Sequence, residues 1–269
     1  MYLEIVPSTL YWSSSASEIS PQLWWRSIVE NFSYLPANQF PEGIQSAVGF
    51  TTICINVPRH LNYLLSTFLA MGGKLVKARL PTDKGLPGAL RFAASLAMSQ
   101  EPHERLICVN ASGLGAKALV PDDAMFPVRG QTVLVKGEAK YAKTMNENKY
   151  VIPRPGSGTT ILGGTREVGN WSTEVSNKAT NAILEGCKSL APELLEKDGS
   201  FEVLSVQCGL RPAREGAPRV EAEIVDGIFK TVHSYGHAGA GYQNAIGSAR
   251  KVVRLVKGLD LEASTSAKL

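Results

Sequence analysis

The sequence lacks the features that mark several classes of protein. Its four cysteines, Cys54, Cys108, Cys187 and Cys208, form no C-x-x-C pair, so a zinc site is not expected. Their wide spacing inside apolar segments is typical of reduced core cysteines in an intracellular protein. No apolar run reaches the roughly 20 residues needed to span a bilayer. The start, MYLEIVPSTLYW, has neither the basic residues nor the cleavage pattern of a secretory leader.

An excess of charge of one sign is also absent. The chain has 28 basic and 24 acidic residues in 269, a net charge of +4. We find no basic stripe interleaved with aromatic residues, so neither nucleic acid nor a membrane is expected as a partner. The four histidines form no metal pattern. Apolar residues make up 44% of the chain, which is ordinary for a globular protein with a sizeable core.

The first half of the sequence predicts alternating strands and helices. Residues 1–49 are rich in Ser, Pro and aromatics and are expected to be irregular. A helix over 58–71 is marked by proline in its first turn and by Gly72-Gly73 after its end. The other elements expected here are strands at 50–56, 74–80 and 105–111 and a helix at 86–98.

After residue 120 the pattern becomes that of an antiparallel sheet. Short apolar runs are separated by turn residues, as strands of such a sheet are. Helices are expected only at 180–195 and 243–259. The predicted strands are QTVLVK, KYVIP, TTILGG, FEVLSVQCG, PRVEAEIV and KTVHSYG.

Two glycine-rich segments are candidate ligand contacts. Gly113-x-Gly115-x-x-Ala118 follows a strand and opens a helix, as a dinucleotide fingerprint does. The next strand, however, ends in Lys136 where an acidic ribose partner is expected, which favours a tight turn late in a cofactor domain. The second segment, YGHAGAGYQ (235–243), leads into the last helix. It is either a simple turn or a close approach of the backbone to an anion at the helix start.

Arg211 follows Gly209-Leu210 at the end of a strand-like run. An arginine there can offer two parallel donors to a carboxylate, or it can be a solvated surface residue. Tyr150 and Arg166 are unremarkable as single residues.

Taken together and in order, these segments resemble the D-amino-acid oxidase family. The resemblance extends from about Trp24 to Leu259. It is carried by VNASGLGA (109–116), FPVRGQTVLVK (126–136), YVIPRPGSGTTILGGTREVGNW (150–171), GLRPAREGAPRVE (209–221) and VHSYGHAGAGYQ (232–243).

The resemblance implies an α/β fold in which a Rossmann-like FAD-binding domain is interleaved with an antiparallel substrate-binding sheet. Residues 1–56 and 121–225 would belong mainly to the substrate sheet. Residues 57–120 and 226–262 would be what remains of the FAD-binding domain, and 263–269 would be an exposed tail.

The resemblance also implies roles for individual residues. Arg211 and the Tyr150 hydroxyl would be the catalytic pair that grips the α-carboxylate of the substrate. Arg166, Gly239 and Gln243 would complete the substrate site. The residues implied to contact FAD are Leu80, Ser112, Arg129, Gly130, Gln131, Gly239, Ala240, Gly241, Tyr242 and Gln243.

The implied reaction is the oxidation of a D-amino acid by FAD and dioxygen to a 2-oxo acid, ammonia and hydrogen peroxide. Hydride passes from the substrate Cα to flavin N5, so the protein orients the reactants and stabilises charge instead of supplying a strong base. Neutral D-amino acids are the first expectation. Arg166 in GGTRE, helped by Lys143 in a segment expected to be a mobile lid, keeps a D-aspartate oxidase open.

One departure from the family is large. Its members begin with a strand, G-x-G-x-x-G and a helix, a unit of roughly 30 residues, and the present sequence contains no such unit. We therefore expect either a fragment of a longer protein, poorly soluble and flavin-free alone, or an inactive remnant that cannot hold FAD.

The sequence closes on Ala267-Lys268-Leu269, which resembles the S-K-L peroxisomal address. An import receptor and residence in the peroxisome matrix are therefore expected, which suits a family whose reaction makes peroxide. A homodimer is left open.

Overall fold

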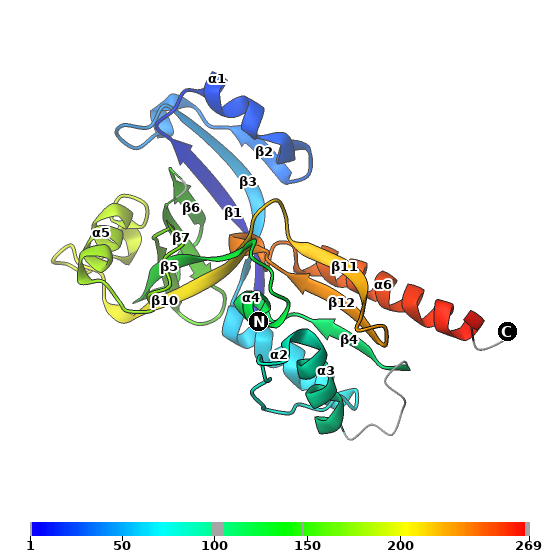
Figure 1. Ribbon diagram of the computed structural model, residues 1–269. Helices are drawn as coiled ribbons and strands as arrows, with labels where there is room; N and C mark the ends of the chain where they lie inside the picture. Colours follow the sequence, from blue (N-terminus) through cyan, green and yellow to red (C-terminus); the bar gives the residue numbers. More distant parts are fainter. Residues whose placement is uncertain (1, 98–104, 147, 267–269) are drawn as a thin grey trace. The chain divides into compact units, whose positions relative to one another are not determined.

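The computed structural model describes residues 2–97, 105–146 and 148–266 (Figure 1). Chain contacts divide the protein into two compact units. The first unit comprises Met1–Lys74, Gly130–Arg166 and Ser172–Gly209. The second comprises Leu75–Arg129, Glu167–Trp171 and Leu210–Leu269. Strands β5 (Met125–Lys136) and β10 (Val203–Arg214) contribute residues to both units. Which segments bind FAD and which bind substrate stays a prediction.

The first unit is built on a mixed sheet. Along the sheet, the strand order is β10-β5-β8-β7-β6-β1-β3-β2. β1 and β6 run parallel, whereas the pairs β1–β3, β2–β3, β6–β7, β7–β8 and β5–β8 are antiparallel. The strands not yet bounded are β1 (Leu3–Trp12), β2 (Glu30–Tyr34), β3 (Ser46–Ile55), β6 (Ala142–Met145), β7 (Lys149–Arg154) and β8 (Thr159–Gly163).

The prediction that residues 1–49 are irregular was wrong. Two strands lie there, and β1 pairs with β3 over its whole length, from Leu3 opposite Ile55 to Trp12 opposite Ser46. Between β1 and β3 the chain also forms short helical turns that pack Ile19 and Leu23 against Val48. These turns are α1 (Ala16–Ile19), η1 (Ser20–Gln22), η2 (Trp24–Ser27) and η3 (Ala37–Gln39).

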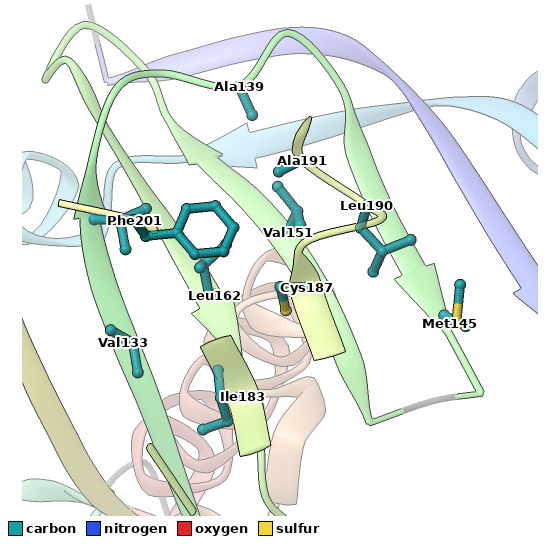
Figure 2. Close-up of a cluster of buried hydrophobic side chains, with 11 residues drawn as sticks. Val133, Ala139, Met145, Val151, Leu162, Ile183, Cys187, Leu190, Ala191 and Phe201 are labelled. Carbon is teal, nitrogen blue, oxygen red and sulfur yellow. The ribbon is translucent and has the colours of Figure 1, made fainter. Parts of the chain in front are cut away.

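The core of the first unit lies where α5 (Asn177–Cys187) packs against β7 and β8. Figure 2 shows Ile183 and Cys187 of this helix pointing toward Leu162 and Val151 of the sheet, with Phe201 beside them. The helix begins where the Ser176 side chain accepts a hydrogen bond from the Ala179 N–H. It ends at Cys187, before the predicted residue 195. Pro192, which does not fit inside a helix, starts the separate turn η6 (Pro192–Leu194).

Helix α2 (Val57–Ala70) also belongs to the first unit, and none of its residues is buried. Leu61, Leu64, Phe68 and Leu69 are among its exposed apolar side chains. The strand predicted over 74–80 is not formed, because residues 74–80 pair with no strand and are exposed.

The second unit contains a three-stranded sheet of order β11-β12-β4. The hairpin of β11 (Arg219–Val225) and β12 (Phe229–Tyr235) is antiparallel, and β4 (Ile107–Asn110) runs parallel to β12. Helix α6 (Ala245–Ser266) packs on all three strands, and α3 (Gly85–Leu96) buries Leu86 and Leu90 against Val225 and Phe229. Strand β9 (Glu167–Val168) pairs with the start of β5. The predicted α/β class is confirmed.

Within the described residues, no helix combines the length and the apolar character that crossing a membrane requires. The predicted targeting tripeptide at 267–269 lies outside the described residues.

Candidate functional site

The Tyr150 ring lies over two glycines, Gly163 and Gly164, which we call the glycine seat. Tyr150 stands on β7 directly opposite Gly163 of β8. A Cβ atom at Gly163 would collide with the phenol ring, and one at Gly164 would lie 2.7 Å from the hydroxyl oxygen. The ring therefore occupies the space that side chains at positions 163 and 164 would fill. Tyr150 stays partly accessible to solvent. This seat was not predicted, although the sequence places Gly163-Gly164 at the end of the strand after YVIPRP.

The backbone below that seat is held from the core. The buried Cys187 thiol of α5 lies 3.6 Å from the carbonyl oxygen of Tyr150 and 3.5 Å from that of Gly163. Burial raises the pKa of Cys187 to about 11, so the thiol stays protonated and donates near neutral pH. The single thiol hydrogen is thus placed to be shared between, or donated to either of, the carbonyl groups of the two paired residues.

In the second unit, Arg211 lies beside the glycine-rich loop before α6. Its Cδ atom is 3.8 Å from the position that a Cβ at Gly239 would take, which is an ordinary van der Waals distance and places the arginine next to the loop. Ala213 bridges His237 of the same loop. Arg214 Nε donates to the Asp122 carboxylate over 2.9 Å. Two predicted substrate residues, Arg211 and Gly239, are therefore brought together.

Ser112 offers an uncommitted hydroxyl at the end of β4. Its Oγ atom is buried and has no hydrogen-bond partner within the described part of the chain. Gly113 follows with φ +59°, a conformation that glycine adopts without strain, and its Cα faces Pro212. The helical turns after it, η5 (Gly113–Gly115) and α4 (Ala116–Leu119), are very short. Gly113-x-Gly115-x-x-Ala118 is thus a tight turn that presents Ser112.

The loop Gly239–Gln243 is open to solvent except for the partly buried Ala240. The turn η7 (Ala238–Ala240) stands at the start of this loop, and the rest of the loop leads to α6. His237 Nε2 lies 2.9 Å from Ser248 Oγ and ties the loop to the helix. The start of a helix as long as α6 carries free N–H groups and a positive partial charge, so this loop can receive an anionic or carbonyl group.

Arg129 and Gln131 are buried and engaged with protein groups. Arg129 pairs with Glu167. The amide of Gln131 donates to Ser176 O and Thr180 Oγ1 and accepts from the Ser176 N–H, each over 2.8 to 2.9 Å. Gln131 thus fastens α5 to β5. That either residue contacts FAD stays a prediction.

Three further predicted residues are placed less favourably. Leu80 is exposed in the segment that forms no strand, and Arg166 is exposed after β8. The expected lid around Lys143 was wrong, because Lys143 lies in β6 between β1 and β7. Its ammonium group donates to the carbonyl oxygen of Leu190 over 2.6 Å, so it is held inside the unit.

Tyr150 and Arg166 belong to the first unit, whereas Arg211, Gly239 and Ser112 belong to the second. Their joint grip on a substrate therefore stays a prediction. In the ranges that the structure covers, no three His, Cys, Asp or Glu side chains are placed to hold a metal ion.

Comparison with known proteins identifies the family to which the chain belongs. The family model described as "FAD dependent oxidoreductase", abbreviated DAO, matches residues 17–255. The chain is 32% identical over 248 residues to a D-amino-acid oxidase of Fusarium vanettenii, covering 88% of the chain and 66% of that protein. It is 30% identical over 231 residues to a D-aspartate oxidase of Talaromyces thermophilus, covering 84% of the chain and 59% of that protein. The chain thus spans two thirds or less of these relatives.

Among solved structures, a glycine oxidase from Geobacillus kaustophilus superposes with a TM-score of 0.70 at 18% identity. The match covers 96% of this chain and 72% of that structure. At this identity the likeness shows a shared fold.

Proposed function

Because this chain belongs to the DAO family of FAD-dependent oxidoreductases, we propose that it serves the oxidation of D-amino acids to 2-oxo acids. The proposed overall reaction takes up dioxygen and water and releases ammonia and hydrogen peroxide. The observation that carries the proposal is the placement of Arg211 beside Gly239, at the loop that opens α6. A guanidinium next to an accessible glycine loop suits a small carboxylate substrate.

FAD is the cofactor of this family, and when bound it accepts the hydride from the substrate Cα. The second unit fits part of such a cofactor. The buried Ser112 Oγ has no partner within the described residues, and Gly239 and Gly241 lie exposed in the loop before α6. Ser112 would donate to or accept from the cofactor, and the loop with the start of α6 would stabilise negative charge.

The chain's own residues have the task of orientation. Arg211 would pair with the substrate α-carboxylate through two parallel donors. The resemblance gives the Tyr150 hydroxyl a share in the same carboxylate, and its ring is fixed over Gly163 and Gly164. Fixing the carboxylate at two points directs the Cα–H bond, which is how positioned groups lower a barrier without acid–base chemistry.

For the side chain of the substrate we propose a small neutral group. An acidic substrate would need a cation to pair with its side-chain carboxylate, and the sequence offered Arg166 and Lys143 for this role. Lys143 instead donates to the carbonyl oxygen of Leu190, which leaves Arg166. Relative rates with D-alanine and D-aspartate distinguish the neutral from the acidic preference.

The experiment that tests the function adds FAD to the chain supplied with the G-x-G-x-x-G unit of the family, because the 269-residue chain alone is expected to be flavin-free. In this reconstituted protein we expect flavin absorption to stay with the protein through gel filtration, and peroxide to form with D-alanine but not L-alanine. Arg211→Ala should abolish peroxide formation, whereas Arg250→Ala, a matched change on the exposed surface of α6, should not. A folded, colourless protein that FAD leaves unchanged would favour the competing class, a non-enzymatic remnant.

We also propose import into peroxisomes through Ala267-Lys268-Leu269. Support comes from the likeness of this ending to S-K-L and from a peroxide-forming reaction. A tagged protein without the three residues should remain in the cytosol. Unchanged punctate localisation after the deletion would refute this proposal.

A further inference from the structure

His233 occupies a buried hydrogen-bond chain in the second unit. It stands on β12, and its side chain has no exposed surface. Its Nδ1 lies 3.1 Å from Nδ2 of Asn110, and its Nε2 lies 3.0 Å from Oε2 of Glu223. Asn110 ends β4, and its Oδ1 accepts a hydrogen bond from the Ser112 N–H over 3.2 Å. The chain thus runs from Glu223 on β11 through the sheet to the turn that presents Ser112.

These contacts fix the protonation state of the imidazole. The amide nitrogen of Asn110 can only donate, so Nδ1 of His233 must accept. The hydrogen of a neutral ring then sits on Nε2 and is donated to the Glu223 carboxylate. All three hydrogen bonds are satisfied together only in this state.

Protonation of His233 would break the pattern, because both ring nitrogens would then be donors. If the Asn110 amide kept its orientation, Nδ1–H would face the amide N–H groups. If the amide turned over, Oδ1 would accept from His233, but the NH₂ group would face the Ser112 N–H. Either way, one of the two hydrogen bonds of Asn110 is lost, and such a loss is costly in a buried place.

The charges around His233 come mainly from β11. Arg219 donates to Glu221 and Glu223, each over 2.7 Å, and also to the hydroxyl of Tyr235, whose ring meets His233 edge-on. Helix α6 packs on the same sheet, and its basic residues Arg250, Lys251, Arg254 and Lys257 are exposed. Burial and the positive charge of Arg219 lower the pKa of His233. Glu223 and Glu221 act in the opposite direction, but the net change is a lower pKa.

We infer that His233 is a positioning residue for the Ser112 turn, which it holds through Asn110 only while its imidazole is neutral. Two further observations indicate that the position of this turn matters for ligand binding. The Ser112 Oγ is buried without a partner in the described part of the molecule, and a Cβ added at Gly113 would lie 3.7 Å from the ring of Pro212, the residue after Arg211. An effect of His233 on FAD affinity rests on the proposed function, but the coupling of His233 to Ser112 does not.

The coupling can be measured without cofactor. In the isotope-labelled chain, NMR follows the His233 ring signals and the Ser112 amide signal as the pH is lowered from 8. We expect the Ser112 amide to shift with the same midpoint as the His233 ring. A Ser112 amide that does not respond while His233 protonates would overturn the inference.

Asn110→Asp provides a sharp variant, because a carboxylate can accept from the Ser112 N–H and from a protonated His233 at once. We expect the His233 midpoint to rise in this variant and the Ser112 amide to stop following it. Asn62→Asp, which makes the same charge change on the exposed surface of α2, should leave both signals as in the parent chain. If Asn110→Asp does not fold, the titration of the parent chain still decides.

The second measurement is the FAD affinity of the reconstituted protein in the same pH range, by quenching of flavin fluorescence. We expect binding about tenfold weaker below the His233 midpoint than above it, the effect of roughly one buried hydrogen bond. The pH dependence should vanish in Asn110→Asp. An FAD affinity that is equal on both sides of the midpoint would overturn the positioning role. Absence of FAD binding at every pH would instead count against the proposed function, while the Ser112 amide still reports on the coupling.

Discussion

Tyr150 and Gly163 face each other across β7 and β8, and the tyrosine ring fills the place where a side chain at position 163 would stand. The pairing explains why β8, which otherwise consists of threonine, isoleucine and leucine, ends in glycine. The two glycines thus leave the space that the ring occupies, and they set the position of the hydroxyl that we propose to bind the substrate carboxylate.

Gly163→Ala should therefore displace the Tyr150 ring. Inserting a methyl group into a filled space costs about 1 to 3 kcal/mol of stability. If Tyr150 binds the substrate carboxylate, KM for D-alanine should rise in the reconstituted protein. In Tyr150→Phe, which already lacks the hydroxyl, Gly163→Ala should raise KM much less. Gly258→Ala, at a helical site with open space around it, is the control; equal KM effects of the two glycine changes would contradict the seat.

Arg211→Ala should leave a substrate carboxylate without its main partner. We expect kcat/KM to fall on the order of 100-fold or more, which corresponds to the loss of several kcal/mol of transition-state stabilisation. Arg211→Lys keeps the charge but not the two-donor geometry, so it should recover only part of the loss. Steady-state kinetics with D-alanine give kcat/KM for the parent protein, Arg211→Ala and Arg211→Lys. A near-normal kcat/KM for Arg211→Ala would remove Arg211 from the site.

The sequence predicts those elements whose signal is local. Helix α2 is marked by Pro58 and Gly72-Gly73, and the β11–β12 hairpin by the turn residues between two apolar runs. Strand β1 was missed because it contains Pro7, and it is stabilised by pairing with β3, more than thirty residues away in the chain. The predicted strand at 74–80 has the right residues, but no neighbour pairs with it within the described chain.

The candidate site shows the same limit. Tyr150 and Arg211 could be named because YVIPRP and GLRP resemble a known family. The glycine seat, the thiol of Cys187 beneath it and the contact of Asn110 with His233 depend on the register of strands and helices far apart in sequence. No periodicity within a single segment carries that information.

Substrate preference tests the role of Arg166, which is exposed. We expect higher kcat/KM with D-alanine than with D-aspartate, and little change in either value for Arg166→Ala. A preference for D-aspartate that disappears in Arg166→Ala would instead show that this guanidinium pairs with a side-chain carboxylate. Lys178→Ala, an exposed change on α5, controls for the loss of a positive charge.

The apolar surface of α2 should limit solubility. Leu61 and Leu64 are each 48% exposed, and clustered exposed apolar side chains favour association. Leu61→Lys with Leu64→Lys should raise the soluble fraction and change the free energy of unfolding by only about 0.5 kcal/mol per site. Leu90→Lys on α3 is the matched contrast, because Leu90 is 7% exposed, and burying a charge there should unfold the second unit. A large loss of stability in the α2 variant would mean that its surface is covered in solution.

The stability of the chain should fall on the acid side of neutrality. Burial lowers the pKa of both His233 and His237, so in the folded chain these rings bind protons at lower pH than in the unfolded chain, where the pKa is about 6.5. Above that value both rings are neutral in both states, and their contribution to stability is fully present. As the pH falls below it, the unfolded state takes up protons first, and the free energy of unfolding decreases until the folded rings protonate as well. Urea denaturation at pH 8 and at pH 5.5 should show this loss, and it should be smaller in His233→Gln, which cannot take up the proton. His60→Gln, which replaces a histidine of α2 in the first unit, is the control. Equal stability of the parent chain at both values of pH would show that protonation of these two rings carries no penalty in the folded state.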